Sequence, residues 1–199
     1  MTDENVIKQM KNYASLHHVP IITDEGLHFI ENYIRKHSIH RILEIGTAIG
    51  YSAICMCNVS DDIAVTTIER DESRYLEAVR NVIDAHLEDR ITLIFGDALE
   101  VSVSDTFDLI FIDAAKAQNI KFFEKYELNL DEKGTIITDN MHFHGLVFQD
   151  EKDIESRNLR QLVRKVKNYK DFLEQNSRYQ TEFYDVGDGL AVSEKNREN

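Results

Sequence analysis

The chain has 199 residues, of which 42% are hydrophobic and 30% charged, and its formal net charge is −13 at pH 7. These values predict one globular domain over residues 1–199 and argue against non-specific nucleic-acid binding over the whole surface. No apolar run approaches the roughly 20 residues of a membrane-spanning helix, and the acidic N-terminus is unlike a signal peptide. We therefore expect a cytoplasmic protein without a membrane partner, in which Cys55 and Cys57 are reduced, buried thiols.

Two helices are predicted before the first strand. Apolar residues at helical spacing indicate a helix over residues 4–17, which is also a candidate contact in an expected homodimer. Thr23-Asp24-Glu25 is typical of the cap of a second helix. From residue 40 onward strand and helix patterns alternate, which predicts parallel βαβ units with right-handed crossovers. The expected strands are 41–45, 64–69, 91–95, 107–113 and 134–139, and the expected helices are 49–58, 71–87, 97–101 and 116–128.

The last part of the chain has a different pattern. A long helix over about 155–175 is followed by two β runs, 179–184 and 190–193, which flank Gly187-Asp188-Gly189. A glycine-rich turn between two β runs predicts an antiparallel hairpin. We therefore expect an α/β fold with a Rossmann-like seven-stranded sheet, five parallel strands plus this hairpin, and helices on both faces. That arrangement resembles the sheet of class I methyltransferases.

A glycine turn follows the first predicted strand. The strand ends at Glu44, and Gly46 and Gly50 lie where a helix begins, which is typical of a nucleotide-binding corner. The spacing G-x-x-x-G differs from the dinucleotide fingerprint, and no lysine follows as in a P-loop. An acid on the strand suits a ligand with an amino group, so the pattern indicates S-adenosylmethionine rather than NAD or ATP. An ordinary strand-to-helix turn is the alternative.

Acidic residues also end the next two predicted strands. Glu69 ends the second strand, where a carboxylate suits the ribose hydroxyls of adenosine. Asp97 and Ala98 follow the third strand, where they could flank the adenine. Each acid alone would be read as a solvated loop residue, but successive strand ends meet at one edge of a parallel sheet.

Oxygen-bearing side chains end the fourth and fifth predicted strands. Asp113 ends one, and Asp139 and Asn140 end the other, which gives three hard oxygen ligands of the type that Mg²⁺ prefers. Mn²⁺ or Ca²⁺ could use the same ligands, and a simple chain turn at Asp139-Asn140 is the alternative. Lys116 begins the following helix, and a bound cation would favour its neutral amine, which makes it a candidate base.

Four separated motifs occur in the order of a known family: Thr23-Asp-Glu-Gly26, Glu44-Ile-Gly-Thr-Ala-Ile-Gly-Tyr-Ser52, Phe111-Ile-Asp-Ala-Ala-Lys116 and Asp139-Asn140. Together they resemble the cation-dependent O-methyltransferases of the catechol and caffeoyl-CoA type, over roughly residues 20–194. The length of the chain and the residues of these motifs most resemble the bacterial tRNA 5-hydroxyuridine methyltransferase group. The resemblance implies a metal site of Asp113, Asp139 and Asn140, with Lys116 and Asp113 as catalytic residues. It also implies that S-adenosylmethionine contacts Ile22, Glu44, Gly46, Ser52, Glu69, Arg70, Asp97, Ala98 and Asp113.

The implied reaction is methyl transfer to a hydroxyl that has a neighbouring oxygen. The metal would act as a Lewis acid, and Lys116 would accept the proton. A catechol-like phenol fits, and so does 5-hydroxyuridine in tRNA, which would become 5-methoxyuridine. We expect the tRNA acceptor, because residues 156–170 carry six bases and no acid in an acidic chain. Leu159, Leu162, Val163 and Val166 would be the buried face of this helix, and the predicted RNA-binding stripe is Arg157, Arg160, Arg164 and Lys167.

Several alternatives stay open. The basic stripe could be an ordinary solvated face. The apolar loop from Met141 to Phe148 could be a gate or a dimer contact, and His142 or His144 could join the metal site. Two other function classes compete, a Rossmann dehydrogenase and a non-catalytic RNA-binding protein that kept the fold. The missing third glycine and the acid–amide metal set argue against the dehydrogenase. The presence of Asp113, Lys116, Asp139 and Asn140 argues against the non-catalytic RNA-binding protein.

Overall fold

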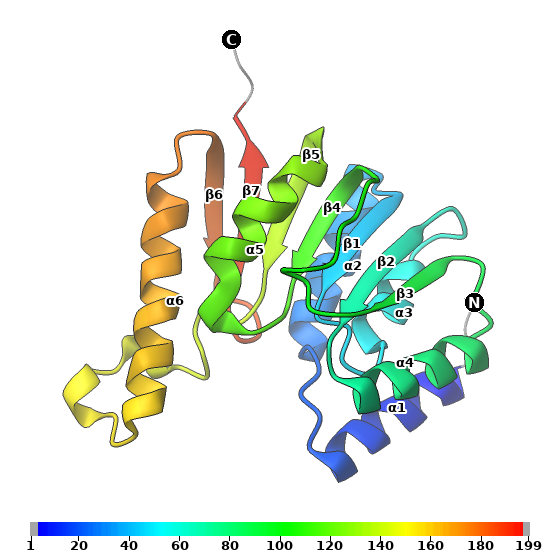
Figure 1. Ribbon diagram of the computed structural model, residues 1–199, viewed down its shortest axis with the longest axis horizontal. Helices are drawn as coiled ribbons and strands as arrows, with labels where there is room; N and C mark the ends of the chain where they lie inside the picture. Colours follow the sequence, from blue (N-terminus) through cyan, green and yellow to red (C-terminus); the bar gives the residue numbers. More distant parts are fainter. Residues whose placement is uncertain (1–3, 197–199) are drawn as a thin grey trace.

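The computed structural model describes residues 4–196 and contains one seven-stranded sheet (Figure 1). The strand order is β3-β2-β1-β4-β5-β7-β6, in which β1 to β5 are parallel and β7 is antiparallel to both of its neighbours. The predicted fold class is confirmed. The strands are β1 (Arg41–Ile45), β2 (Ala64–Glu69), β3 (Ile91–Phe95), β4 (Phe107–Ile112), β5 (Leu130–Thr138), β6 (Tyr179–Tyr184) and β7 (Leu190–Lys195).

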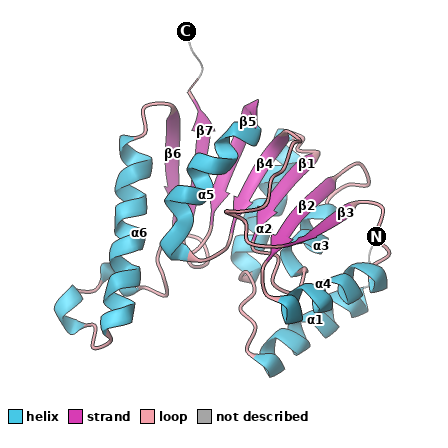
Figure 2. Cartoon of the chain, in the orientation of Figure 1, coloured by secondary structure: helices cyan, strands magenta, loops and turns pink. Residues whose placement is uncertain are grey.

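Helices cover both faces of the sheet (Figure 2). Side chains of a strand alternate between the two faces. Ile42 accordingly packs with residues of α1, α2 and α3, whereas its neighbour Leu43 packs with residues of α5 and α6. The first group is α1 (Glu4–His17), α2 (Asp24–His37), α3 (Tyr51–Cys57) and α4 (Glu72–Asp84), and the second is α5 (Asn119–Tyr126) and α6 (Arg157–Gln175). Among the described residues, none of these helices has both the length and the apolar character needed to cross a bilayer.

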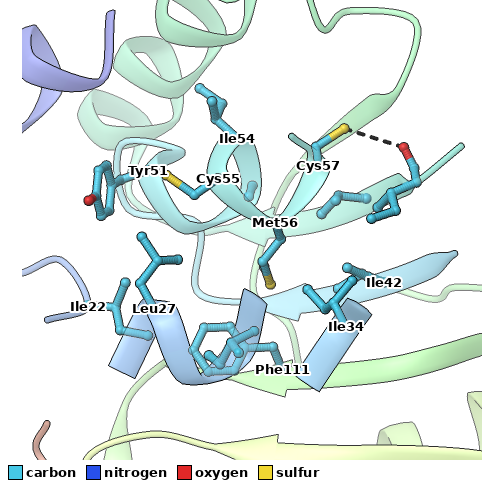
Figure 3. Packing of buried hydrophobic residues seen from close by; sticks show 14 of the residues in the cluster. Ile22, Leu27, Ile34, Ile42, Tyr51, Ile54, Cys55, Met56, Cys57 and Phe111 are labelled. Carbon is cyan, nitrogen blue, oxygen red and sulfur yellow. Dashed lines mark hydrogen bonds between the residues drawn. The ribbon is translucent and has the colours of Figure 1, made fainter. Parts of the chain in front are cut away.

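Helix α3 lies deepest, because all seven of its residues are buried. It packs against both the sheet and α2, which agrees with its largely apolar sequence (Figure 3). Cys55 and Cys57 are both free and buried, as predicted. Their sulfur atoms point to different sides of the helix, and the thiol of Cys57 lies 3.4 Å from the carbonyl oxygen of Ile63.

The prediction of a helix over residues 97–101 is wrong. The segment forms a single turn, in which the amides of Glu100 and Val101 both donate to the carbonyl of Asp97, at 2.8 and 2.9 Å. The Asp97 side chain caps the turn through the amide of Leu99 at 2.8 Å. Alternating valine and serine follow, and both are weak helix formers, so the turn does not continue.

Three smaller predictions also needed correction. Strand β5 begins at Leu130 rather than residue 134, because its pairing with β4 shifts register between Phe107 and Leu109 and lets the strand continue through the irregularity. Leu159, predicted to face the core, is 38% exposed, because only the side of α6 that carries Val163 and Val166 is buried. The segment predicted as a helix over 116–128 begins and ends in short 3-10 turns, η1 (Lys116–Gln118) and η2 (Glu127–Asn129), around α5.

Candidate active site

A cavity of about 380 Å³ lies at the carboxyl ends of the parallel strands. This is the edge where open α/β sheets bind their ligands. Every strand end singled out from the sequence contributes to it, together with Pro20–Thr23 before α2. The sequence-predicted residues that line the cavity are Ile22, Gly46, Ser52, Glu69, Arg70, Asp97, Ala98, Asp113, Lys116, Asp139 and Asn140.

Glu44 lies beneath the cavity rather than in its lining. Its side chain is fully buried, and it accepts hydrogen bonds from the hydroxyls of Ser52 and Thr67, the latter at 2.5 Å. Burial raises the pKa of this carboxyl to about 7, although the two hydroxyl bonds oppose the shift. Because Ser52 itself lines the cavity, Glu44 orients a cavity residue from below.

Glu69 fixes the backbone around the end of β2. One carboxylate oxygen accepts the amide of Ala48 at 2.8 Å, and the other accepts those of Arg70 at 3.0 Å and Asp71 at 2.8 Å. These bonds hold the carboxylate at the cavity wall, where its charge can act on a ligand. Arg70 reaches Asp97 from the same rim, with 3.8 Å between the charged groups.

The structure gives a reason for glycine at position 46 that the sequence did not indicate. Its φ is +104°, and a Cβ at this position would lie 2.2 Å from the carbonyl oxygen of Asp113. The close approach made possible by this glycine is therefore to the neighbouring strand end, which brings Asp113 to the cavity. Gly50, at φ +84°, is the N-cap of α3.

Asp113 and Lys116 follow β4, Asp139 and Asn140 follow the adjacent strand β5, and all four line the cavity. The pKa of both carboxyls is raised, chiefly by burial, and the charge of Asp113 raises that of Asp139 further. Lys116 acts in the opposite direction on both, and its ammonium donates to the amide oxygen of Asn140. Asn140 adopts φ +63°, a conformation that asparagine tolerates, and its backbone amide donates to Asp139 at 2.6 Å.

The donor set of these residues fits a hard divalent cation. It consists of two repelling, largely buried carboxylates and a neighbouring amide oxygen, the ligand types that Mg²⁺ and related ions prefer. Among the described residues, no three side chains of the His, Cys, Asp and Glu types converge as a metal-binding group. A cation here would therefore depend on the Asn140 oxygen as its third protein donor.

The segment after β5 is joined to the β6–β7 turn. The amide of Met141 donates to the carbonyl of Gly189 at 3.0 Å, and the amide of His142 donates to that of Asp188 at 2.8 Å. The ring of His142 lies 3.4 Å from the exposed Asp185 and outside the cavity lining, whereas His144 lines the cavity. These contacts place the His142–Gln149 segment, which includes η3 (Leu146–Phe148), beside the proposed metal residues.

Asp188 is a cavity residue that the sequence analysis treated only as part of a turn. It lines the same cavity as Asp113 and Asp139, and its charge raises the pKa of both. The sequence did contain a signal for a functional role, because Asp188 lies between two glycines and a glycine turn does not by itself require an acidic residue. The other lining residues that were not singled out are mainly small or apolar, among them Thr47, Ala48, Tyr51, Ile68 and Phe122.

The basic residues of α6 differ from one another in their surroundings. Arg157 and Arg164 are exposed and Lys167 is half-buried. Arg160 is committed to the start of its own helix, because its guanidinium donates to the carbonyls of Ile154 and Glu155. The helix packs against η1, which carries Lys116, and against η3.

Comparison with known proteins assigns the chain to a family. The O-methyltransferase family profile matches residues 2–196. The chain belongs to the O-methyltransferase family. Its fold is similar to that of a Staphylococcus aureus protein provisionally named a caffeoyl-CoA O-methyltransferase, with a TM-score of 0.91 and 44% identity over 96% of this chain and 92% of that one.

Two further relatives of this O-methyltransferase carry more specific descriptions. A catechol O-methyltransferase from Mycobacterium tuberculosis is 30% identical over 122 residues, which cover 58% of this chain and 54% of that protein. A Bacillus cereus O-methyltransferase, solved in complex with SAH, has the same fold, with a TM-score of 0.83 and 23% identity over 98% of this chain and 93% of that one.

Proposed function

We propose that this O-methyltransferase transfers the methyl group of S-adenosylmethionine, in the presence of a divalent cation such as Mg²⁺, to a hydroxyl that has a neighbouring oxygen. The observation that carries the proposal is a single cavity. It is lined both by residues suited to bind an adenosine group and by Asp113, Asp139, Asn140 and Lys116. The SAH complex of the Bacillus cereus relative supports the choice of methyl donor.

The roles of the residues follow from their chemistry. Glu69 would hold the ribose hydroxyls, and Ser52, oriented by Glu44, would face the amino acid part of the donor. Asp113, Asp139 and Asn140 would hold the cation, which when bound supplies Lewis acidity to the acceptor oxygens. Lys116, next to Asn140, would accept the hydroxyl proton.

The names of relatives favour a small catechol-like phenol as the acceptor. The Mycobacterium tuberculosis relative is named a catechol O-methyltransferase, and the provisional name of the Staphylococcus aureus protein also refers to a phenolic substrate. Two adjacent phenolic oxygens would meet the cation and Lys116 together.

One feature of this chain favours a second acceptor, 5-hydroxyuridine in tRNA, whose two neighbouring oxygens present the same geometry. Helix α6 is rich in arginine and lysine although the whole chain has a net charge of −13, and it packs against the turn that carries Lys116. Exposed Arg157 and Arg164 could bind RNA phosphates while one unstacked base enters the cavity.

The two acceptors are distinguished by following the labelled methyl group of S-adenosylmethionine. The enzyme is incubated with Mg²⁺ and either total RNA from cells that lack this protein or a small catechol. Transfer to catechol alone assigns the phenol, and label in 5-methoxyuridine assigns tRNA. A chelator abolishes either reaction if the cation is required, and transfer that persists in excess chelator would contradict the metal-dependent mechanism.

Charge-reversal variants test the contribution of α6. Arg157→Glu with Arg164→Glu should lower transfer to RNA at least about tenfold at moderate salt, because phosphate contacts are lost, and should leave transfer to catechol unchanged. Arg35→Glu with Arg80→Glu, which reverses two exposed charges on α2 and α4, is the matched control. Equal effects of the two double variants would contradict an RNA role for α6.

A further inference from the structure

The two carboxylate oxygens of Asp188 have different surroundings. The side chain is 10% exposed, and Oδ1 accepts the backbone amide of His144 at 2.5 Å. Oδ2 is buried and has no hydrogen-bond partner within the described part of the chain. The His144 ring approaches Oδ2 only to 3.5 Å, and that ring is 78% exposed. A buried carboxylate oxygen without a donor is unfavourable unless a ligand supplies one.

The turn that carries Asp188 is fixed on both sides by glycines. A Cβ on Gly187 would lie 2.4 Å from the hydroxyl oxygen of Thr23, and a Cβ on Gly189 would lie 2.6 Å from the ring of His142. The turn thus contacts the cap of α2 on one side and the chain leaving β5 on the other, and Figure 1 shows these segments meeting at one end of the sheet. The direction of the Asp188 side chain is therefore set by packing.

Asp188 lines the same cavity as the two proposed metal carboxylates. A third carboxylate adds repulsion to the pair formed by Asp113 and Asp139, and the charge of Lys116 opposes that repulsion by lowering the pKa of both. One lysine leaves this group of three acids with net negative charge. Since the three do not converge as direct ligands, a bridging donor is needed between Asp188 and a bound cation.

We propose that Asp188 is a positioning residue for the divalent cation, whose Oδ2 accepts hydrogen bonds from water bound to an ion held by Asp113, Asp139 and Asn140. Through Oδ1 the same carboxylate holds the backbone of His144. Cation binding and the placement of the His142–Gln149 segment beside the acceptor site are then coupled through one side chain. The inference rests on the proposed metal dependence.

The test measures Mn²⁺ binding to the full chain by electron paramagnetic resonance, without any acceptor or methyl donor. The variant is Asp188→Asn, in which an amide oxygen can still accept the His144 amide while the anionic Oδ2 is lost. Outer-sphere partners of metal sites commonly change affinity 10–100-fold, so we expect Mn²⁺ to bind about tenfold more weakly. Asp185→Asn, three residues earlier with a side chain 97% exposed, is the control and should bind as the unaltered protein does.

Thermal unfolding of the metal-free protein supplies a second measurement. If Asp188 mainly adds repulsion to Asp113 and Asp139 when no cation is bound, Asp188→Asn should unfold at the same or a higher temperature. A lower temperature together with unchanged Mn²⁺ affinity would assign Asp188 to the structure of the turn alone and overturn the inference. Equal Mn²⁺ affinity in the variant and the unaltered protein would also overturn it, whereas failure of the unaltered protein to bind Mn²⁺ would contradict the proposed function itself.

Discussion

At the scale of single residues, the buried carboxyl of Glu44 connects the site to the stability of the protein. Its pKa is about 7 in the folded chain against an ordinary value of 4.5. Between these two pH values the folded state retains a proton that the unfolded state releases. The contribution of Glu44 to the free energy of unfolding therefore decreases as pH rises through this window, and it is constant above pH 7.

We expect Glu44→Gln to remove this pH dependence. The amide is neutral at all pH values, and the hydroxyls of Ser52 and Thr67 can accept as well as donate. The difference in unfolding free energy between the variant and the unaltered protein should grow, in favour of the variant, by on the order of 3 kcal/mol from pH 4 to pH 8. Urea unfolding at both pH values measures it, with Glu88→Gln, an exposed site, as control. A difference that is independent of pH would contradict the assignment.

Gly46→Ala should disrupt the site through a steric clash. The new Cβ would lie 2.2 Å from the carbonyl oxygen of Asp113, so the ends of β1 and β4 must separate. We expect a loss of at least about 2 kcal/mol in unfolding free energy, together with loss of S-adenosylmethionine binding, measured by urea unfolding and calorimetry.

Gly145→Ala is the matched control for that variant. Gly145 also has positive φ, +78°, but nothing lies within 4 Å of its Cβ position. It should therefore show only the conformational cost of about 1 kcal/mol. Equal losses in the two variants would mean that backbone conformation, rather than the approach to Asp113, explains Gly46.

At the scale of elements, helix α6 is anchored to the sheet by a buried hydrogen bond. The hydroxyls of Tyr169 and Thr138 are 2.7 Å apart, and both residues are about 1% exposed. Tyr169→Phe should lower the free energy of unfolding by about 1–2 kcal/mol, because the Thr138 hydroxyl loses this partner. Adding Thr138→Val should recover part of that loss, as measured by a double-mutant cycle in urea. Additive losses would show that the two hydroxyls act independently.

The elements were predictable where the sequence pattern and the packing agree. The bounds of β1, β2 and β3 match the prediction, because each is a short apolar run bordered by turns. The predicted helix over 97–101 failed because capping by Asp97 stabilises one turn as well as it starts a helix. Leu159 was placed on the wrong side because the basic and apolar stripes of α6 are adjacent, and spacing alone does not mark the boundary between them.

The cavity could be predicted where an acid follows a strand, since the sheet brings those positions together. Its lining includes the predicted metal residues and all the predicted donor-binding residues except Glu44. Asp188 could not be found in this way, because it lies in a hairpin turn that approaches the cavity from a distant part of the chain. Glu44 was predicted to contact the ligand, but the structure places it outside the cavity lining, hydrogen-bonded to the lining residue Ser52.

At the scale of the whole molecule, the cavity joins segments from most of the chain, so a ligand bound there should stabilise the entire fold. With S-adenosylmethionine at 100 times its dissociation constant, mass action adds about 2.7 kcal/mol to the free energy of unfolding. Thermal unfolding with and without the ligand measures this, and Gly46→Ala should show no shift. No stabilisation of the unaltered protein by either S-adenosylmethionine or its demethylated product would contradict the proposed cofactor.

The β6–β7 turn has a consequence for the order of folding. The pairs β1–β2, β2–β3 and β4–β5 join strands that follow one another in the sequence, whereas Gly187 must meet Thr23 across most of the chain. Contacts of this kind tend to form late, since closing long loops costs entropy. The sheet should therefore acquire its secondary structure before it can hold a ligand. In a refolding experiment the far-ultraviolet circular dichroism signal should then recover before ligand binding does. Ligand binding would therefore indicate that the whole chain has folded.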